Sequence, residues 1–192
     1  MPRQYGEDVA LIKEIKQELG AFPMILNIGS GPGKLDGYLN VDKFGYDDGV
    51  DVVEDLDNYP WSFNDNQFDL ILCNHYIEHV HDIVRTMEEI HRVGKPGGQV
   101  VIRTPYFANY ESFRDPTHRW HLAWESFDYF VGGFGDIYTK ARFELMNKRL
   151  SFAEAWRNPG YYLFRINSRF YEKYFSHLLP GTWLYVHLKV KK

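Results

Sequence analysis

The 192-residue sequence predicts an α/β fold, a mostly parallel sheet of seven strands with helices on both faces. Two observations predict this class. Short apolar runs alternate with segments of helical periodicity, and strands separated by helices form parallel sheets through right-handed crossovers. The first apolar run also ends abruptly in a loop with glycine at positions 29, 31 and 33. Because ligands of open α/β sheets bind beyond the carboxyl ends of strands, this loop is a candidate ligand site.

The elements follow in order from periodicity and from their start and stop signals. Residues 8–19 place Ile12, Ile15 and Leu19 on one helical face, and Gly20 follows as a C-cap. Asp82 is the expected N-cap of a helix that the glycine-rich segment 94–98 stops. Further helices are expected near 124–131 and over 168–178. The expected strands are 24–28, 38–41, 50–53, 68–73, 99–103, 142–152 and 183–190, the last at or near the antiparallel end of the sheet.

Length and composition indicate one ordinary globular domain over residues 1–192. The net charge of −4 argues against a nucleic-acid partner held by bulk electrostatics. The one cysteine, Cys73, excludes an intrachain disulfide and suits a reducing compartment. The polar N-terminus and the lack of any apolar stretch approaching 18 residues predict no membrane association. We therefore expect a cytoplasmic protein.

Aromatic residues are spread unevenly along the chain. Residues 1–103 contain 10 Phe, Tyr and Trp, whereas residues 104–192 contain 23. This asymmetry predicts a cofactor-binding first half and an aromatic-rich, substrate-side second half. An aromatic core with a homodimer interface explains the same composition as well as an aromatic-lined substrate pocket does. Both interpretations stay open at the level of sequence.

The glycine loop matches neither of two common nucleotide motifs. A phosphate-binding P-loop needs four residues before its Gly-Lys pair, whereas three separate Gly29 from Gly33, and Lys34 is followed by Leu35. The dinucleotide pattern places its third glycine one residue later than here. A tight strand-to-turn connection without a ligand remains the simplest alternative.

Several further segments carry a resemblance to a known family. The chain resembles the class I S-adenosylmethionine-dependent methyltransferases, in particular their small type 11 group, from about Leu26 to Phe130. Each motif is weak alone, but together their order and spacing are specific, and they imply a Rossmann-like fold. The motifs are Leu26–Gly33, Leu39–Asp42, Asp51–Leu56, Phe68–Leu72, Tyr76–His79 and Glu89–Gly98.

The resemblance implies S-adenosylmethionine as the cofactor. The glycine loop is expected beneath its methionine portion, and Asn74 near the transferred methyl group. Asp42 is expected to accept hydrogen bonds from both ribose hydroxyls, since a carboxylate offers two acceptor oxygens. Asp55 is expected to accept from the adenine amino group; otherwise both aspartates are solvated turn residues. The implied cofactor-binding residues are Gly29, Ser30, Gly31, Gly33, Asp42, Asp55, Leu56 and Asn74.

Two departures from the family pattern concern the first crossover. Only eight residues separate Gly33 from Asp42, too few for a regular helix, so residues 34–38 are expected to form a turn. Asn27 stands where many relatives of the family have an acid. We expect the missing charge to weaken cofactor affinity.

Histidines supply the candidate catalytic groups. Methyl transfer relies chiefly on positioning, and a general base helps when the acceptor must lose a proton. His118 lies in an Asp-Pro-Thr-His segment after the fifth strand, and His75 follows the fourth. We expect His118 to act as the base on a hydroxyl of a sugar, polyol or aromatic small molecule, or to bind that substrate, and His75 is the next candidate for the base. The alternative for His118 is a side chain that pins its loop.

Two other functional readings stay open. The donors His75, Glu78, His79 and His81 form a compact group in sequence, but their spacing matches no common zinc motif, and no metal is predicted. A non-catalytic S-adenosylmethionine-binding subunit or scaffold would share the cofactor motifs. A nicotinamide-dependent oxidoreductase is disfavoured by the glycine spacing.

Overall fold

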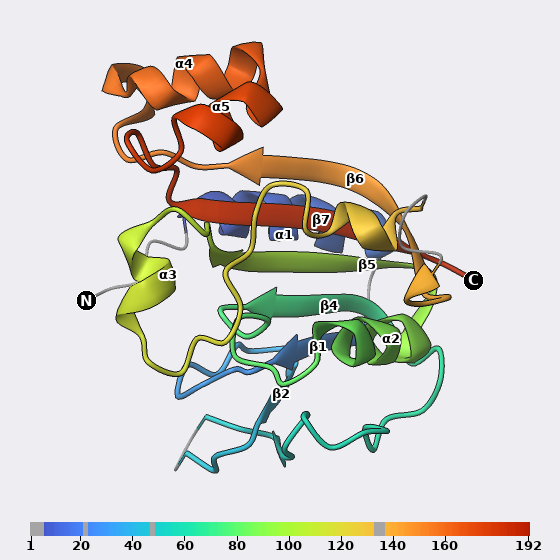
Figure 1. Ribbon diagram of the computed structural model, residues 1–192. Helices are drawn as coiled ribbons and strands as arrows, with labels where there is room; N and C mark the ends of the chain where they lie inside the picture. The colour runs from blue at the N-terminus through green and yellow to red at the C-terminus, as the bar shows by residue number, and fades with distance from the viewer. Residues whose placement is uncertain (1–5, 21–22, 47–48, 133–136) are drawn as a thin grey trace.

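A seven-stranded sheet forms the centre of the computed structural model, which describes residues 6–20, 23–46, 49–132 and 137–192 (Figure 1). The strand order is β3-β2-β1-β4-β5-β7-β6. The first five strands run parallel, and β7 is antiparallel to both of its neighbours, β5 and β6. The strands are β1 (Ile25–Ile28), β2 (Leu39–Asp42), β3 (Val52–Val53), β4 (Phe68–Asn74), β5 (Gly94–Pro105), β6 (Arg142–Leu150) and β7 (Trp183–Lys191). The predicted fold class is confirmed.

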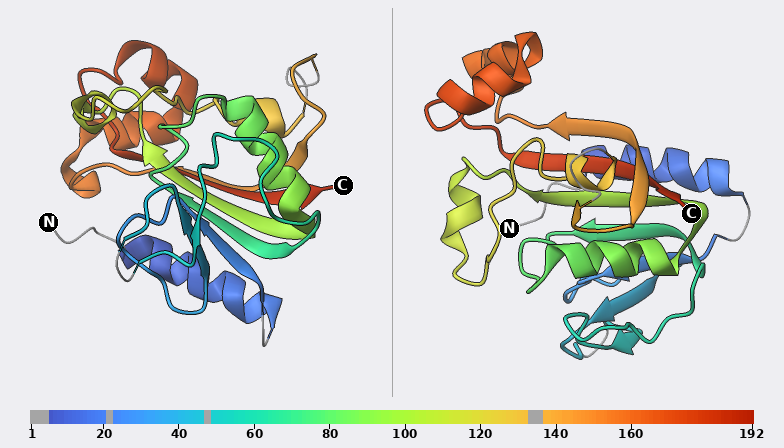
Figure 2. Two further views of the ribbon diagram at one scale, coloured as in Figure 1. Left: turned by 90° about the horizontal axis from the view of Figure 1, so that it is seen from below. Right: turned by 45° about the vertical axis from the view of Figure 1, so that its right-hand side comes forward.

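Helices cover both faces of this sheet (Figure 2). On one face α1 (Gly6–Leu19) buries Ile15 against Ile25 and Leu70, and Gly20 follows it with a positive φ of 85°. On the other face α2 (Ile83–Val93) packs the stripe that includes Met87. The side chain of Asp82 caps α2 by accepting a hydrogen bond from the backbone N–H of Arg85 at 3.0 Å. Both helices were expected from sequence periodicity.

The connection between β1 and β2 is a loop, as the short spacing predicts. Asn40, fully buried on β2, holds this loop in place of a helix. Its amide nitrogen donates to the carbonyl oxygens of Leu35 and Tyr38, and its amide oxygen accepts from the backbone N–H of Leu35. The Asp51 carboxylate accepts from Asn40 and from Lys34. Side-chain hydrogen bonds of Asn40 and Asp51 therefore hold the connection between β1 and β2, which in longer chains contains a crossover helix.

The region after β5 differs from the sequence expectations in detail. A helix was expected near 124–131, but only a 3-10 turn, η1 (Asp128–Phe130), forms there. The expected helix over 168–178 is shorter, α5 (Ser168–Tyr174), and two helices were not anticipated: α3 (Tyr110–Arg114) and α4 (Pro159–Ile166). The side chain of Asn167 caps the start of α5 where α4 ends, by accepting from the Phe170 N–H. This cap divides one apolar stretch into two helices.

Many aromatic residues of the second half form a separate core beneath α4 and α5. Tyr106, Leu150, Phe152 and Tyr171 are its buried members. The Tyr171 hydroxyl donates to the carbonyl of Leu179 at 2.8 Å and so anchors the return to β7. Packing thus accounts for part of the aromatic excess. No helix in the described part of the chain has the length and apolar character that crossing a bilayer requires.

Candidate functional site

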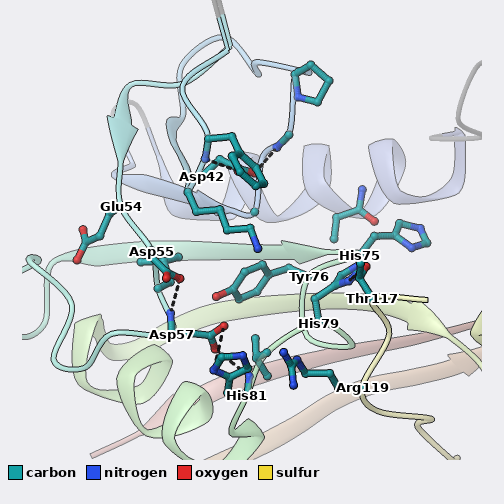
Figure 3. A pocket seen from close by; sticks show the side chains of 18 of the residues that line it. Asp42, Glu54, Asp55, Asp57, His75, Tyr76, His79, His81, Thr117 and Arg119 are labelled. Carbon is teal, nitrogen blue, oxygen red and sulfur yellow. Dashed lines mark hydrogen bonds and ion pairs between the residues drawn. The ribbon is translucent and has the colours of Figure 1, made fainter. Parts of the chain in front are cut away.

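A cavity of about 730 Å³ opens beyond the carboxyl ends of β1, β2 and β4 (Figure 3). The chain turns outward in opposite directions from β1, to β2 on one side and β4 on the other, and this reversal leaves a crevice. The volume lies in the range of small-molecule and cofactor sites. The lining includes Gly29, Gly31, Asp42, Glu54, Asp55, Leu56, Asp57, Asn74, His75, Tyr76, His79, His81, Thr117 and Arg119.

Two glycines of the first loop have left-handed backbone, for different reasons. Gly29 has φ 63°, and a Cβ there would lie 2.4 Å from the ring of Tyr76. Gly31 has φ 59°, but a Cβ there would meet no atom within 4 Å. Packing inside the protein therefore requires Gly29, whereas Gly31 borders open space. Ser30 between them is buried and donates its backbone N–H to the carbonyl of Val41.

Asp42 ties the glycine loop to the end of β2. Its Oδ2 accepts the backbone N–H of Gly31 at 2.9 Å, and its Oδ1 accepts that of Phe44 at 3.0 Å. A carboxylate oxygen has more than one acceptor site, so both oxygens keep capacity for ligand hydroxyls. Asp42 thus shapes the loop and faces the cavity at once.

Acidic residues gather at one end of the cavity, on the loop after β3 (Figure 3). Asp55 is exposed, and its Oδ1 accepts the N–H of Asp57 at 3.2 Å. Leu56 is buried, and its carbonyl accepts the indole N–H of Trp61. The carboxylate of Glu54 is held by the backbone N–H and hydroxyl of Ser62. This end offers a hydrogen-bond acceptor beside an apolar wall.

Asn74 and His75 form the opposite end, where β4 stops. The Oδ1 of Asn74 is buried and has no hydrogen-bond partner among the described residues. His75 has φ 53°, and its ring meets that of Trp183 edge-on at 4.7 Å. Its Nδ1 lies 3.3 Å from Oε1 of the fully buried Glu78. If the carboxylate accepts this hydrogen bond, Nε2 of His75 is left as a proton acceptor.

His118 lies beside the cavity rather than in its wall. Its Nδ1 is 3.0 Å from the carbonyl oxygen of Ser112, and its ring meets that of His79 edge-on at 4.7 Å. The neighbouring Thr117 and Arg119 do line the cavity. The structure therefore brings together seven of the predicted residues and leaves three outside the lining: Ser30, Gly33 and His118.

Sequence reasoning missed three residues that shape this cavity. Tyr76 packs under the glycine loop, and Thr117 and Arg119 approach from the far loop. Thr117 belongs to the Asp-Pro-Thr-His segment, which was a usable signal for it, and its hydroxyl contacts Nδ1 of His79 at 2.9 Å. No spacing rule in the sequence predicts that Tyr76 meets Gly29.

The chain matches the family model described as "Methyltransferase domain" over residues 39–102. Among curated proteins it is similar to "Arginine-hydroxylase NDUFAF5, mitochondrial" of Homo sapiens, with 29% identity over 93 residues. That alignment takes in 40% of this chain and 27% of the human protein, so the chain spans about a quarter of its relative.

Solved structures share the fold along nearly the whole chain. One is the YcgJ protein of Bacillus subtilis, at 15% identity and TM-score 0.59, covering 96% of this chain and 99% of that one. Another is an S-adenosylmethionine-dependent methyltransferase of Mesorhizobium loti, at 15% identity and TM-score 0.56, covering 94% and 96%. At such identities the likeness concerns the fold, and the family model covers part of the cavity lining, from Asp42 to His81, but not the glycine loop.

Proposed function

We propose that the chain is a class I S-adenosylmethionine-dependent methyltransferase that methylates a hydroxyl of a small-molecule or glycan-type acceptor; the match to a methyltransferase-domain model over residues 39–102 and the shared fold support this. The observation that carries this proposal is the cavity beyond β1 and β4. It has a glycine loop tied to Asp42 along one wall, carboxylate acceptors at one end and the His75–Glu78 pair at the other.

The cofactor is proposed to lie along the cavity from Asp55 to Asn74. Asp42 would accept from the ribose hydroxyls, and Asp55 from the adenine amino group, with Leu56 against the ring. Gly31 would leave room for the methionine portion, with Ser30 and Gly33 supporting the loop. The buried Oδ1 of Asn74, which has no partner among the residues that the structure describes, suits the cofactor's ammonium group, because an unmet buried acceptor costs about 1–3 kcal/mol.

The acceptor is proposed to enter past Thr117 and Arg119. The cofactor supplies an electrophilic methyl group on a good leaving group. Nε2 of His75 would take the proton that the acceptor hydroxyl loses as its oxygen gains the methyl group. Glu78 would hold the His75 ring through Nδ1. A base of this kind contributes roughly 10²–10⁴-fold.

His75 is the stronger of the two candidate bases. It lines the cavity next to Asn74, whereas His118 does not line it. The helix α3 and the loop after it, which carries His118, also present exposed aromatic side chains, including Tyr110, Phe113 and Trp120. Flat amphipathic rings of this kind suit a sugar or aromatic acceptor.

The decisive experiment measures S-adenosylhomocysteine formation from methyl-labelled cofactor over a panel of sugars, polyols and phenols. His75→Asn should lower turnover on the active acceptor at least ~10²-fold and leave the Kd for S-adenosylhomocysteine within about twofold. His121→Asn, which changes an exposed histidine outside the cavity, serves as the control.

The same assay tests the alternatives. If His118→Ala and not His75→Asn lowers turnover with cofactor affinity unchanged, His118 is the base. Tight cofactor binding with no label transferred to any acceptor would favour a non-catalytic binding subunit. The human relative is named for hydroxylation, so product mass must show a gain of one methyl group rather than one oxygen.

A further inference from the structure

Three potential metal ligands converge beside the cavity from two distant segments. Glu78 and His79 follow β4, and His118 belongs to the loop after α3. One ligand atom from each of the three lies within 4.8 Å of the others. The backbone holds the segments together, because the N–H groups of Arg119 and Trp120 donate to the carbonyl of Glu78. The convergence therefore rests on main-chain hydrogen bonds as well as on side chains.

The hydrogen bonds around the two imidazoles set their tautomers. The Thr117 hydroxyl donates to the Asp115 carboxylate at 2.7 Å, so it accepts from Nδ1–H of His79 at 2.9 Å. Nδ1 of His118 donates to the Ser112 carbonyl at 3.0 Å, since a carbonyl oxygen can only accept. Both rings therefore keep an unprotonated Nε2. Metal-binding histidines have this arrangement, with the second ring nitrogen donating to an acceptor.

Glu78 supplies an independent observation. Its side chain is fully buried, and while Oε1 contacts His75, Oε2 has no hydrogen-bond partner among the described residues. A buried carboxylate oxygen without a partner is costly, and a bound cation removes that cost. This oxygen without a partner therefore belongs to Glu78, the residue that lies within ligand distance of both His79 and His118.

We propose that Glu78, His79 and His118 bind one divalent metal ion of the zinc class. Two neutral imidazoles and one carboxylate form a ligand set used by catalytic zinc sites, which keep a fourth position open. Imidazole ligands disfavour magnesium and calcium. The sequence predicted no metal, and its four-donor group is not the one assembled here, because Nδ1 of His81 instead lies 3.8 Å from Asp57.

The site goes beyond the proposed methyl transfer and does not depend on it. Since His79 and Thr117 line the cavity, the open metal position lies on the acceptor side. Binding through Nε2 would make His118 a ligand rather than a base. Oε1 of Glu78 remains with His75, so one carboxylate serves both groups.

The test titrates Zn²⁺ into the protein, freed of any histidine tag, by calorimetry, and records the visible spectrum with Co²⁺. We expect one ion per chain and no comparable binding of Mg²⁺. His118→Ala should weaken Zn²⁺ binding at least ~100-fold. This exceeds the roughly 10–100-fold loss typical when only a residue that hydrogen-bonds to a metal ligand is removed. His121→Asn, which removes a histidine from the same loop, should bind as the wild type does.

Two further measurements keep the result interpretable. Thr117→Val should keep the stoichiometry and weaken binding by roughly 10–100-fold, because it removes the partner of His79. Circular dichroism checks the fold of each variant. Absence of stoichiometric Zn²⁺ binding, or equal Zn²⁺ affinity in wild type and His118→Ala, would overturn the proposal. A parallel S-adenosylhomocysteine titration shows whether the cofactor site fails independently of the metal site.

Discussion

At the residue scale, one glycine of the loop is needed for packing and another for space in the cavity, and the sequence pattern does not show which is which. Gly29 lies against Tyr76, and Gly31 borders the cavity. Both have positive φ, a region that costs a residue with a side chain about 1–2 kcal/mol. The difference between them is steric, and substitutions at the two positions should therefore separate folding from binding.

Gly29→Ala is expected to destabilise the fold by roughly 2–4 kcal/mol, because overpacking against Tyr76 adds to the left-handed strain. Gly31→Ala should cost only about 1–2 kcal/mol, and Gly31→Val should fold yet lose cofactor binding. Urea unfolding measures the first effect, and calorimetry with S-adenosylhomocysteine measures the second. Equal destabilisation by the two alanines would show that the Tyr76 contact does not matter.

Asp42→Ala is expected to weaken S-adenosylmethionine binding by about 1–3 kcal/mol, the cost of leaving ligand hydroxyls unpaired. It should also loosen the loop, since Gly31 and Phe44 lose their acceptor. Titration calorimetry gives the affinity, and circular dichroism checks the fold. Asp36→Ala, an exposed aspartate on the same loop, is the control and should bind normally. Unchanged affinity in a folded Asp42→Ala protein would remove Asp42 from the site.

At the element scale, a polar network replaces the first crossover helix. The Asp51 carboxylate accepts from Lys34 at 2.6 Å and from the backbone and side chain of Asn40. The hydrogen bond from Lys34 and those from Asn40 lower the pKa of Asp51 to about 2. A carboxyl whose pKa is depressed in the fold stabilises it above the unfolded pKa, near 3.9. That contribution is lost as the pH falls toward 2.

Because of this network, the Asp51→Asn substitution should destabilise the fold by an amount that depends on pH. The variant should unfold at lower urea concentration than the wild type at pH 6. The difference should narrow as the pH falls from about 4 to about 2, because Asp51 becomes protonated first in the unfolded chain and then increasingly in the fold. Lys34→Gln should show the same narrowing with a smaller amplitude. A difference between wild type and Asp51→Asn that stays constant from pH 6 to pH 2 would mean that Asp51 carries no such linkage.

At the scale of the whole molecule, the cavity depends on where the chain reverses its direction across the sheet. β1 lies between β2 and β4, so segments far apart in sequence meet beyond its carboxyl end. The long connection after β5 brings Thr117 and Arg119 to the cavity, whereas α4 and α5 lie beside β6 at the far edge of the sheet (Figure 1). A ligand in the cavity would contact the segments after β2 and after β4, which lie on opposite sides of β1, and its binding should stabilise the whole fold.

S-adenosylhomocysteine at about 100 times its Kd should stabilise the protein by roughly 2.7 kcal/mol. For a chain of this size, that corresponds to a rise in melting temperature of roughly 5–11 °C. Differential scanning fluorimetry across a ligand series measures it. NAD at the same concentration should give no rise. A rise in melting temperature with NAD and none with S-adenosylhomocysteine would show that the cavity binds a nicotinamide cofactor instead.

Elements with strong local signals were predictable. The strand ending at Asn74 is a nearly continuous apolar run, and α2 has both an N-cap and a stop signal. The helices α3 and α4 were not predictable, because each is short, although an asparagine cap begins each of them. Helices of five and eight residues are marginal by themselves, so tertiary packing decides whether they form.

The sequence by itself determined the α/β class, the seven strands in chain order, the helices α1 and α2, and the loops that carry the candidate cofactor residues. These follow from periodicity and from glycine and cap positions, which act over a few residues. Only the tertiary structure decided that Gly29 meets Tyr76, that His75 pairs with Glu78, and that His118 joins His79. Such contacts link residues through the sheet and its loops, and their distances depend on packing that no local pattern encodes.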